Sequence, residues 1–145
     1  MLAAGVAIAA AAVVTAAALV WPDSTAGARA DDPDQVRLGA AVYADHCAAC
    51  HGARLEGQAA WQQRKPDGKL PAPPHDETGH TWHHPDRQLF DITKQGLAPV
   101  AGAAYATDMP AYRDVLTDRQ IWAVLAFIKS RWPPDIQQRQ SRLNR

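Results

Sequence analysis

The sequence contains little sulfur and no excess charge. Its 145 residues include two cysteines and two methionines, and fifteen lysines and arginines balance fifteen aspartates and glutamates. The balanced charge gives nucleic acid binding no electrostatic support, so we expect no nucleic acid partner. No stretch alternates apolar and polar residues with a period of two, so no strand is predicted and the fold class is all-α. The length suits one ordinary domain.

The first 21 residues carry no charged side chain. A helix that crosses a bilayer needs roughly 20 apolar residues, whereas the apolar part of a signal peptide usually spans about 7–15. Trp21 would lie at the membrane interface, and Pro22 would end the helix. We therefore expect residues 1–21 to be a retained membrane anchor, followed by a linker over residues 22–33. A signal segment cleaved near Ala30 is the alternative, and either case predicts export.

Three segments have helical periodicity. The first begins at Asp34, the second begins at Pro85 and closes at Gly96, and the third follows Thr117, the N-cap of a capping box, and ends at Pro133. Their predicted buried stripes are Val36, Gly39, Ala40, Tyr43 and Cys47; Leu89, Ile92 and Thr93; and Ile121, Val124, Leu125, Ile128 and Trp132.

Long irregular segments separate these helices. Residues 52–84 contain many prolines and little periodicity, and residues 97–116 are also irregular. A structureless loop as long as the first is uncommon in a compact domain unless it serves a function, so another group must supply the core that it wraps. Residues 133–145 are basic, and we expect them to form a solvated, mobile tail.

The two cysteines belong to the motif CAACH, which admits several interpretations. A thioredoxin-like redox pair would accompany a βαβ pattern, and the sequence predicts no strand. A structural zinc site needs a second pair of ligands, and no second cysteine pair exists. A disulfide across so short a loop would stabilise little. We favour covalent attachment of one haem c, in which Cys47 and Cys50 bond to the haem vinyl groups and His51 coordinates the iron.

An electron-transfer haem needs a second axial ligand, and methionine is a usual partner of histidine. Met1 lies at the start of the apolar segment, which leaves Met109 in the irregular sequence ATDMPAY. We therefore expect His51 and Met109 to bind the iron. A peroxidase or a gas sensor would need an open axial position, and Met109 argues against it.

Over residues 34–132 the chain resembles the class I c-type cytochromes. The resemblance rests on the segments CAACHG, HPDRQLFDITKQG, DMPAY and LTDRQIWAVLAFIKSRW. It implies a cytochrome c-like fold, in which small helices wrap around one covalently bound haem. It also implies that Gly39 and Tyr43 meet Trp122 or Phe127, where the first and last helices of the domain cross.

The resemblance further implies a partner for the ring of the proximal histidine. In that family a proline carbonyl accepts a hydrogen bond from the imidazole, which fixes the orientation and basicity of the ring. In the segment LPAPPHD we assign this carbonyl to Pro73, with Pro74 as the next candidate.

A cluster of histidines follows within ten residues: His75, His80, His83 and His84. With the neighbouring Asp76 and Glu77 they could bind copper or zinc. The alternative is that they cap a helix, pack, or bond to haem propionates and loop carbonyls. We expect His46, which precedes the motif, to be exposed rather than a ligand.

These observations predict a one-electron carrier rather than an enzyme. It would work in a respiratory chain at the outer face of a bacterial inner membrane, with its haem domain in the periplasm and other redox proteins as partners. The alternatives are a soluble periplasmic form, a permanent haem subunit of a membrane oxidase or dehydrogenase complex, and a haem protein with an additional metal-binding histidine loop.

Overall fold

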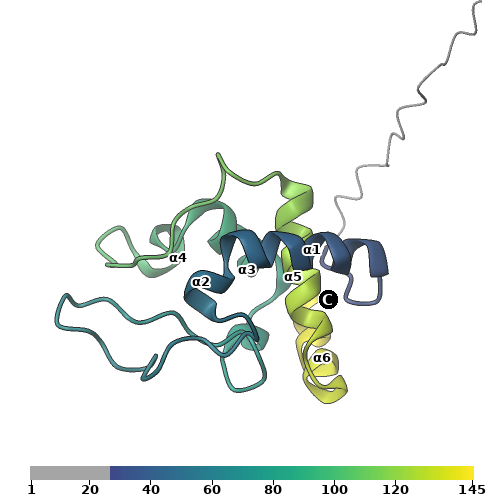
Figure 1. Ribbon diagram of the computed structural model, residues 1–145, viewed down its shortest axis with the longest axis horizontal. Helices are drawn as coiled ribbons and strands as arrows, with labels where there is room; N and C mark the ends of the chain where they lie inside the picture. The colour runs from purple at the N-terminus through teal and green to yellow at the C-terminus, as the bar shows by residue number, and fades with distance from the viewer. Residues whose placement is uncertain (1–26) are drawn as a thin grey trace, which may run out of the picture.

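The computed structural model describes residues 27–145, and these residues form helices and turns without a strand. The elements in chain order are α1 (Pro33–His46), α2 (Ala48–His51), the 3-10 helix η1 (Thr81–His83), α3 (Asp86–Gln95), α4 (Ala98–Ala101), α5 (Asp118–Ser130), α6 (Pro134–Ser141) and the 3-10 helix η2 (Arg142–Asn144). The all-α prediction is therefore confirmed. Figure 1 shows α1 crossing α5, α6 below the lower end of α5, and the two long irregular segments to the left of the crossing.

The crossing of α1 and α5 depends on a glycine. A Cβ atom on Gly39 would lie 1.9 Å from the carbonyl oxygen of Ala123 and 2.8 Å from Cβ of Phe127, so only glycine allows the two backbones to come this close. One turn later the ring of Tyr43 packs 5.3 Å from the ring of Phe127. The predicted contact with Phe127 is confirmed, whereas Trp122 stacks instead on Phe90 of α3 at 4.3 Å.

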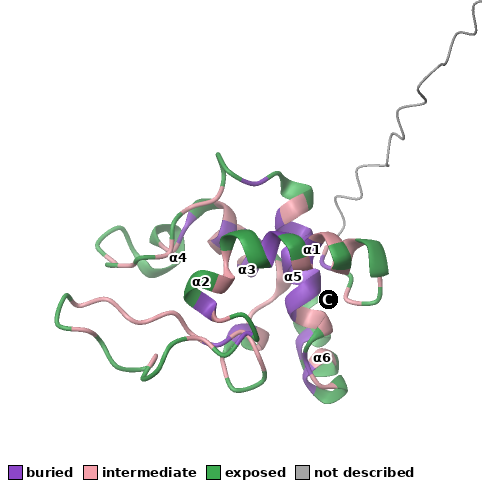
Figure 2. Cartoon of the chain, viewed as in Figure 1, coloured by how far each residue is buried: buried purple, intermediate pink, exposed green. Residues whose placement is uncertain are grey.

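Helix α5 forms the centre of the core. Every residue from Ile121 to Ile128 is buried, which is typical of a helix covered on all sides (Figure 2). Its start is fixed as predicted, because the Thr117 hydroxyl accepts a hydrogen bond from Gln120 N–H and the Gln120 side chain accepts one from Thr117 N–H. The surrounding helices therefore pack around α5, and the first residue of α5 is determined by its own capping box.

Helix α3 ends at Gly96 as predicted, but its buried face differs from the predicted one. The buried residues are Leu89, Phe90 and Thr93, while Ile92 is only half-buried. The physical reason is the stacking of Phe90 on Trp122, because an aromatic ring buries more apolar surface than an isoleucine side chain and gains from ring contact.

The structure also differs from the prediction of a mobile C-terminal tail. Residues 134–141 form α6, and Ile136 and Gln140, one helical turn apart, are both buried. The Gln140 amide donates to the Asp86 carboxylate at 2.6 Å, and the Asn144 side-chain oxygen accepts from Asp86 N–H at 2.7 Å. The basic side chains that suggested a tail are all exposed, but only Arg139 lies in α6, while Arg142 lies in η2 and Arg145 follows it.

The structure describes only part of the chain that precedes α1. The predicted membrane anchor, residues 1–21, and the first part of the predicted linker lie outside the described residues. Ala28, from the second part of the linker, packs into the core at 7% exposure. Within residues 27–145, no helix combines the length and the apolar character needed to cross a membrane.

A largely buried ion pair joins α3 to α5, and removing one member should destabilise the protein. Lys129 Nζ lies 2.8 and 2.6 Å from the two carboxylate oxygens of Asp86, with the side chains 11% and 14% exposed. Lys129→Met should lower the free energy of unfolding by about 2 kcal/mol, less than for a fully uncompensated charge because Gln140 still donates to the carboxylate.

Urea denaturation of the full protein measures this effect. Arg37→Met is the matched control, because Arg37 pairs with Asp34 on the open surface of α1, where an ion pair contributes about 0.5 kcal/mol or less. Equal stability losses in the two variants would contradict a specific role for the buried pair.

Candidate functional site

The CAACH motif is placed at the end of α1 and forms one helical turn. Cys47 caps α1 through its N–H, which donates to the Tyr43 carbonyl at 2.9 Å. The N–H groups of Cys50 and His51 donate to the Cys47 carbonyl at 3.1 and 2.9 Å. A single turn of helix thus presents two thiols and an imidazole, and Tyr43 fixes its far end by donating its hydroxyl to the Gly52 carbonyl at 2.8 Å.

Both thiols are free, and their surroundings differ. Cys50 is exposed and Cys47 is half-buried. Burial, reinforced by the neighbouring Cys50, raises the pKa of the Cys47 thiol to about 11, so this thiol is protonated at neutral pH. A thioredoxin-like pair requires a thiol that ionises readily, so the structure argues against that interpretation of the motif.

His51 is buried and held in one orientation. Its Nδ1 lies 2.8 Å from the carbonyl oxygen of Pro73, the proline that the sequence analysis favoured. Because a carbonyl can only accept, Nδ1 carries the proton and Nε2 presents a lone pair. Burial lowers the pKa of His51, partly opposed by the hydrogen bond to Pro73, so the ring is neutral at neutral pH. Neutral imidazole is the form that ligates a metal.

A tight turn after the motif brings Pro73 to His51. Gly57 N–H donates to the His51 carbonyl at 2.7 Å, and His75 N–H donates to the Leu55 carbonyl at 2.8 Å. Gly57 has φ +67°, and a Cβ atom there would lie 2.4 Å from the backbone nitrogen of Pro74. Gly57 is a positioning residue that the sequence analysis did not identify, because only the approach of the distant prolines distinguishes it from any loop glycine.

His75 packs against the imidazole of His51, a contact that the sequence did not predict. Its ring stacks on the His51 ring with centroids 4.0 Å apart, and its Nδ1 lies 2.8 Å from the Thr81 hydroxyl. Trp132 donates its indole N–H to the His75 carbonyl at 2.7 Å. Burial, with the neighbouring imidazoles of His51 and His80, holds the pKa of His75 well below its usual value. A neutral His75 therefore braces the ring of His51.

The other histidines of the cluster do not converge. His80 stacks on Trp61 at 5.3 Å, His83 stacks on Trp82 at 3.7 Å, and His84 meets His80 edge-on at 5.6 Å. Within residues 27–145, no group of three or more histidine, cysteine or acidic side chains is arranged to hold a metal ion. The hypothesis of a metal-binding histidine loop therefore finds no support. His46 is exposed, as expected.

Met109 is half-buried in the second irregular segment, which is anchored on both sides of it. Before it, Asp108 forms ion pairs with Lys65 and Lys69 of the first irregular segment. After it, the hydroxyl of Tyr112 donates to the His46 carbonyl at 2.7 Å, directly before the motif. Tyr112 belongs to the segment DMPAY, but the sequence analysis assigned it no role.

The donor set fits a covalently bound haem c. Two unpaired thiols lie on the same helical turn as a neutral imidazole whose Nε2 lone pair is available and whose Nδ1 is already bonded. In such an arrangement Cys47 and Cys50 would form the thioether bonds and His51 would ligate the iron. The haem would supply reversible one-electron oxidation and reduction.

Comparison with known proteins indicates the same cofactor. Residues 36–132 match the family described as "Cytochrome c". The chain belongs to the cytochrome c family. Electron transfer through haem follows from this membership, and a covalently bound haem c is the cofactor that the family implies.

One curated relative of this cytochrome is a "Gluconate 2-dehydrogenase cytochrome c subunit" from Pantoea cypripedii. The two sequences are 38% identical over an alignment of 107 residues, and the match covers 68% of this chain and 21% of the relative. The chain thus spans about a fifth of the length of the curated relative that it matches. No solved structure matches the chain.

Proposed function

We propose that this cytochrome carries single electrons through one haem c, bound covalently by Cys47 and Cys50 and ligated axially by His51 and Met109. Its redox partners would belong to a respiratory chain. The proposed location is the periplasmic face of a bacterial inner membrane, with residues 1–21 as the anchor, or the soluble periplasm after cleavage near Ala30. The observation that carries the proposal is the neutral His51, fixed by the Pro73 carbonyl next to two free thiols.

The side chains of the protein would tune the electron transfer of the haem, and no covalent bond would be made or broken. One electron enters and one leaves. The hydrogen bond from His51 Nδ1 to Pro73 raises the electron density at Nε2, and the stacked His75 keeps the imidazole from rotating. Burial of His51 would keep water away from its imidazole, and methionine as the second ligand would raise the potential.

A second candidate is a permanent electron-transfer subunit of a dehydrogenase complex. The observation that favours it is the similarity to the gluconate 2-dehydrogenase subunit. In that case the electron donor would be the dehydrogenase subunit itself. Co-purification of the tagged full protein with a stoichiometric oxidoreductase through gel filtration would favour the subunit, and elution of the cytochrome alone would favour the mobile carrier.

The absorption spectrum of the purified haem-loaded protein, ferric and ferrous, tests the proposed ligation. We expect a six-coordinate spectrum, a weak Met-to-ferric-iron band, and no change when carbon monoxide is added to the ferrous protein. Ready binding of carbon monoxide would mean an open or labile axial position, and a haem enzyme or a gas sensor would then replace the carrier as the proposed function.

A further inference from the structure

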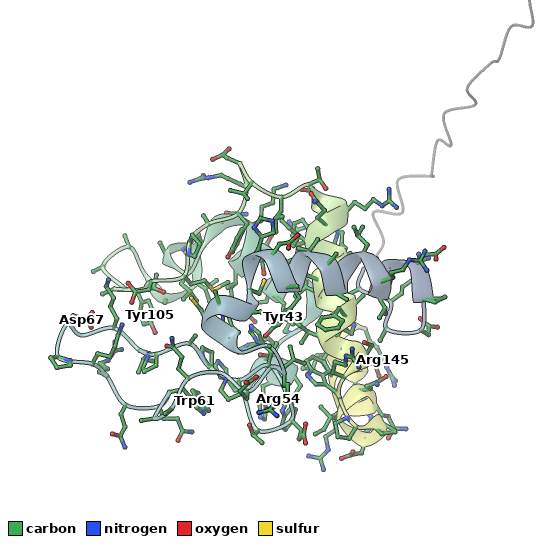
Figure 3. The ribbon with its side chains drawn as sticks, viewed as in Figure 1. Tyr43, Arg54, Trp61, Asp67, Tyr105 and Arg145 are labelled. Atoms are coloured by element: carbon green, nitrogen blue, oxygen red, sulfur yellow. The ribbon has the colours of Figure 1, made fainter. Side chains whose placement is uncertain are left out.

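Residues 61–69, which we name the strap, contact residues 105–109, which we name the methionine segment. Lys65 Nζ lies 2.8 Å from Asp108 Oδ2, and Lys69 Nζ bonds to the other carboxylate oxygen of Asp108. The guanidinium group of Arg64 lies over the ring of Tyr105, 5.5 Å from its centroid. Figure 3 shows Tyr105 beside the loop that carries Asp67, so the tips of the two irregular segments meet.

The strap presents its two lysines from a closed turn. Lys65 N–H donates to the Lys69 carbonyl and Gly68 N–H donates to the Lys65 carbonyl, each at 2.9 Å. The Arg64 side chain closes the turn further by donating to the Gly68 carbonyl at 2.6 Å. Because the turn fixes both lysine backbones, forming the two ion pairs orders less chain than it would between two free loops.

Met109 directly follows the residue that the strap holds. Its own N–H donates only to the Thr107 hydroxyl, at 3.0 Å, within the methionine segment. The next tie to the body of the protein comes after Met109, where Tyr112 N–H donates to the Thr93 carbonyl at 3.0 Å. On the side before Met109, the contacts between the methionine segment and the strap are made by Asp108 and Tyr105.

We propose that Lys65 and Lys69 are positioning residues that, through Asp108, keep Met109 bound to the haem iron. This inference rests on the proposed His51/Met109 ligation. One carboxylate shared by two ammonium groups holds more firmly than an isolated surface pair. The side chains of Lys65, Lys69 and Asp108 are 39%, 32% and 52% exposed, so salt should screen the attraction and weaken the hold on Met109.

Competition by imidazole for the ferric iron of the full haem-loaded protein measures this hold. Imidazole can bind only when Met109 leaves, so its apparent affinity reports how often the methionine is released. Asp108→Asn, and separately Lys65→Gln with Lys69→Gln, should each strengthen imidazole binding about tenfold. Asp67→Asn is the matched control, because Asp67 lies 3.7 Å from Lys65 on the strap itself, and it should change binding less than about twofold.

Salt dependence and charge reversal separate positioning from general stability. Between roughly 0.01 and 1 M salt the unmodified protein should approach the affinity of Asp108→Asn, while that variant changes little. Asp108→Lys should strengthen imidazole binding at least as much as Asp108→Asn, because it adds repulsion from Lys65 and Lys69, and combining it with Lys65→Glu and Lys69→Glu should restore tight methionine binding. A merely structural loss would be neither salt-dependent nor restored.

Two results would overturn the inference, and they differ. If the unmodified protein shows the Met-to-ferric-iron band but Asp108→Asn binds imidazole as weakly as the control, the strap does not position Met109 and the proposed ligation stands. If the unmodified protein lacks that band, both the ligation and the inference fail.

Discussion

Met109→Ala is expected to open one axial position of the haem iron. Methionine sulfur contributes the sixth ligand in the proposed site, and alanine offers no atom that can replace it. The ferrous variant should bind carbon monoxide, the weak Met-to-ferric-iron band should disappear, and the reduction potential should fall by the order of 0.2 V, within the range of about 0.8 V that axial ligands span. Optical spectroscopy and a redox titration measure all three.

Two further substitutions at the same position separate ligation from packing. Met109→Leu keeps most of the side-chain volume but removes the sulfur, so it should reproduce the alanine spectrum. Met109→His restores a ligand, so it should remain closed to carbon monoxide at a lowered potential. A wild-type spectrum in Met109→Ala would identify a different sixth ligand.

Gly39→Ala is expected to destabilise the protein strongly, although helix propensity alone predicts the opposite. In an isolated helix, alanine is about 1 kcal/mol more favourable than glycine. Here the added Cβ would lie 1.9 Å from the carbonyl oxygen of Ala123, a backbone atom that cannot rotate away. The two helices must separate, and overpacking of this kind costs about 3 kcal/mol.

The exposed Ala41 on the same helix provides the control. Ala41→Gly should lower stability by about 1 kcal/mol through propensity alone, without any effect on the crossing. Urea denaturation of both variants gives the comparison. If Gly39→Ala were more stable than the unmodified protein, propensity would dominate and the close crossing would not limit the packing of α1 on α5.

The features that sequence could predict are those set by near neighbours. The capping box at Thr117 involves residues three apart, the end of α3 needs only Gly96, and the CAACH turn lies within five residues. Their hydrogen bonds close over a single helical turn, so local chemistry determines them. The haem motif was readable for the same reason.

The features that sequence did not predict depend on distant partners. Phe90 replaces Ile92 on the buried face of α3 because Trp122, far along the chain, offers a ring to stack on. The C-terminal residues fold because Gln140 reaches the Asp86 carboxylate. Neither choice has a local signature, since each is decided by which surface the helix meets.

At the site, too, local features could be predicted from the sequence, whereas the residues that hold the CAACH motif in place through long-range contacts could not. Pro73 was assigned from the resemblance to the class I c-type cytochromes, and the structure places its carbonyl on His51. The bracing by His75 and the need for glycine at position 57 arise only after the chain has turned back on itself. Spacing along the sequence indicates which groups are present but not which of them stack.

The crossing of α1 and α5 closes a loop that contains both irregular segments. Roughly 80 residues separate Gly39 from Ala123, and bringing the ends of such a loop together costs about 4 kcal/mol of chain entropy. That entropy grows only logarithmically with length, so doubling the loop would add about 0.6 kcal/mol. The free energy of forming the α1–α5 pair therefore depends little on the length of the chain between the two helices. Segments such as the strap can lengthen or change in sequence without destabilising this pair.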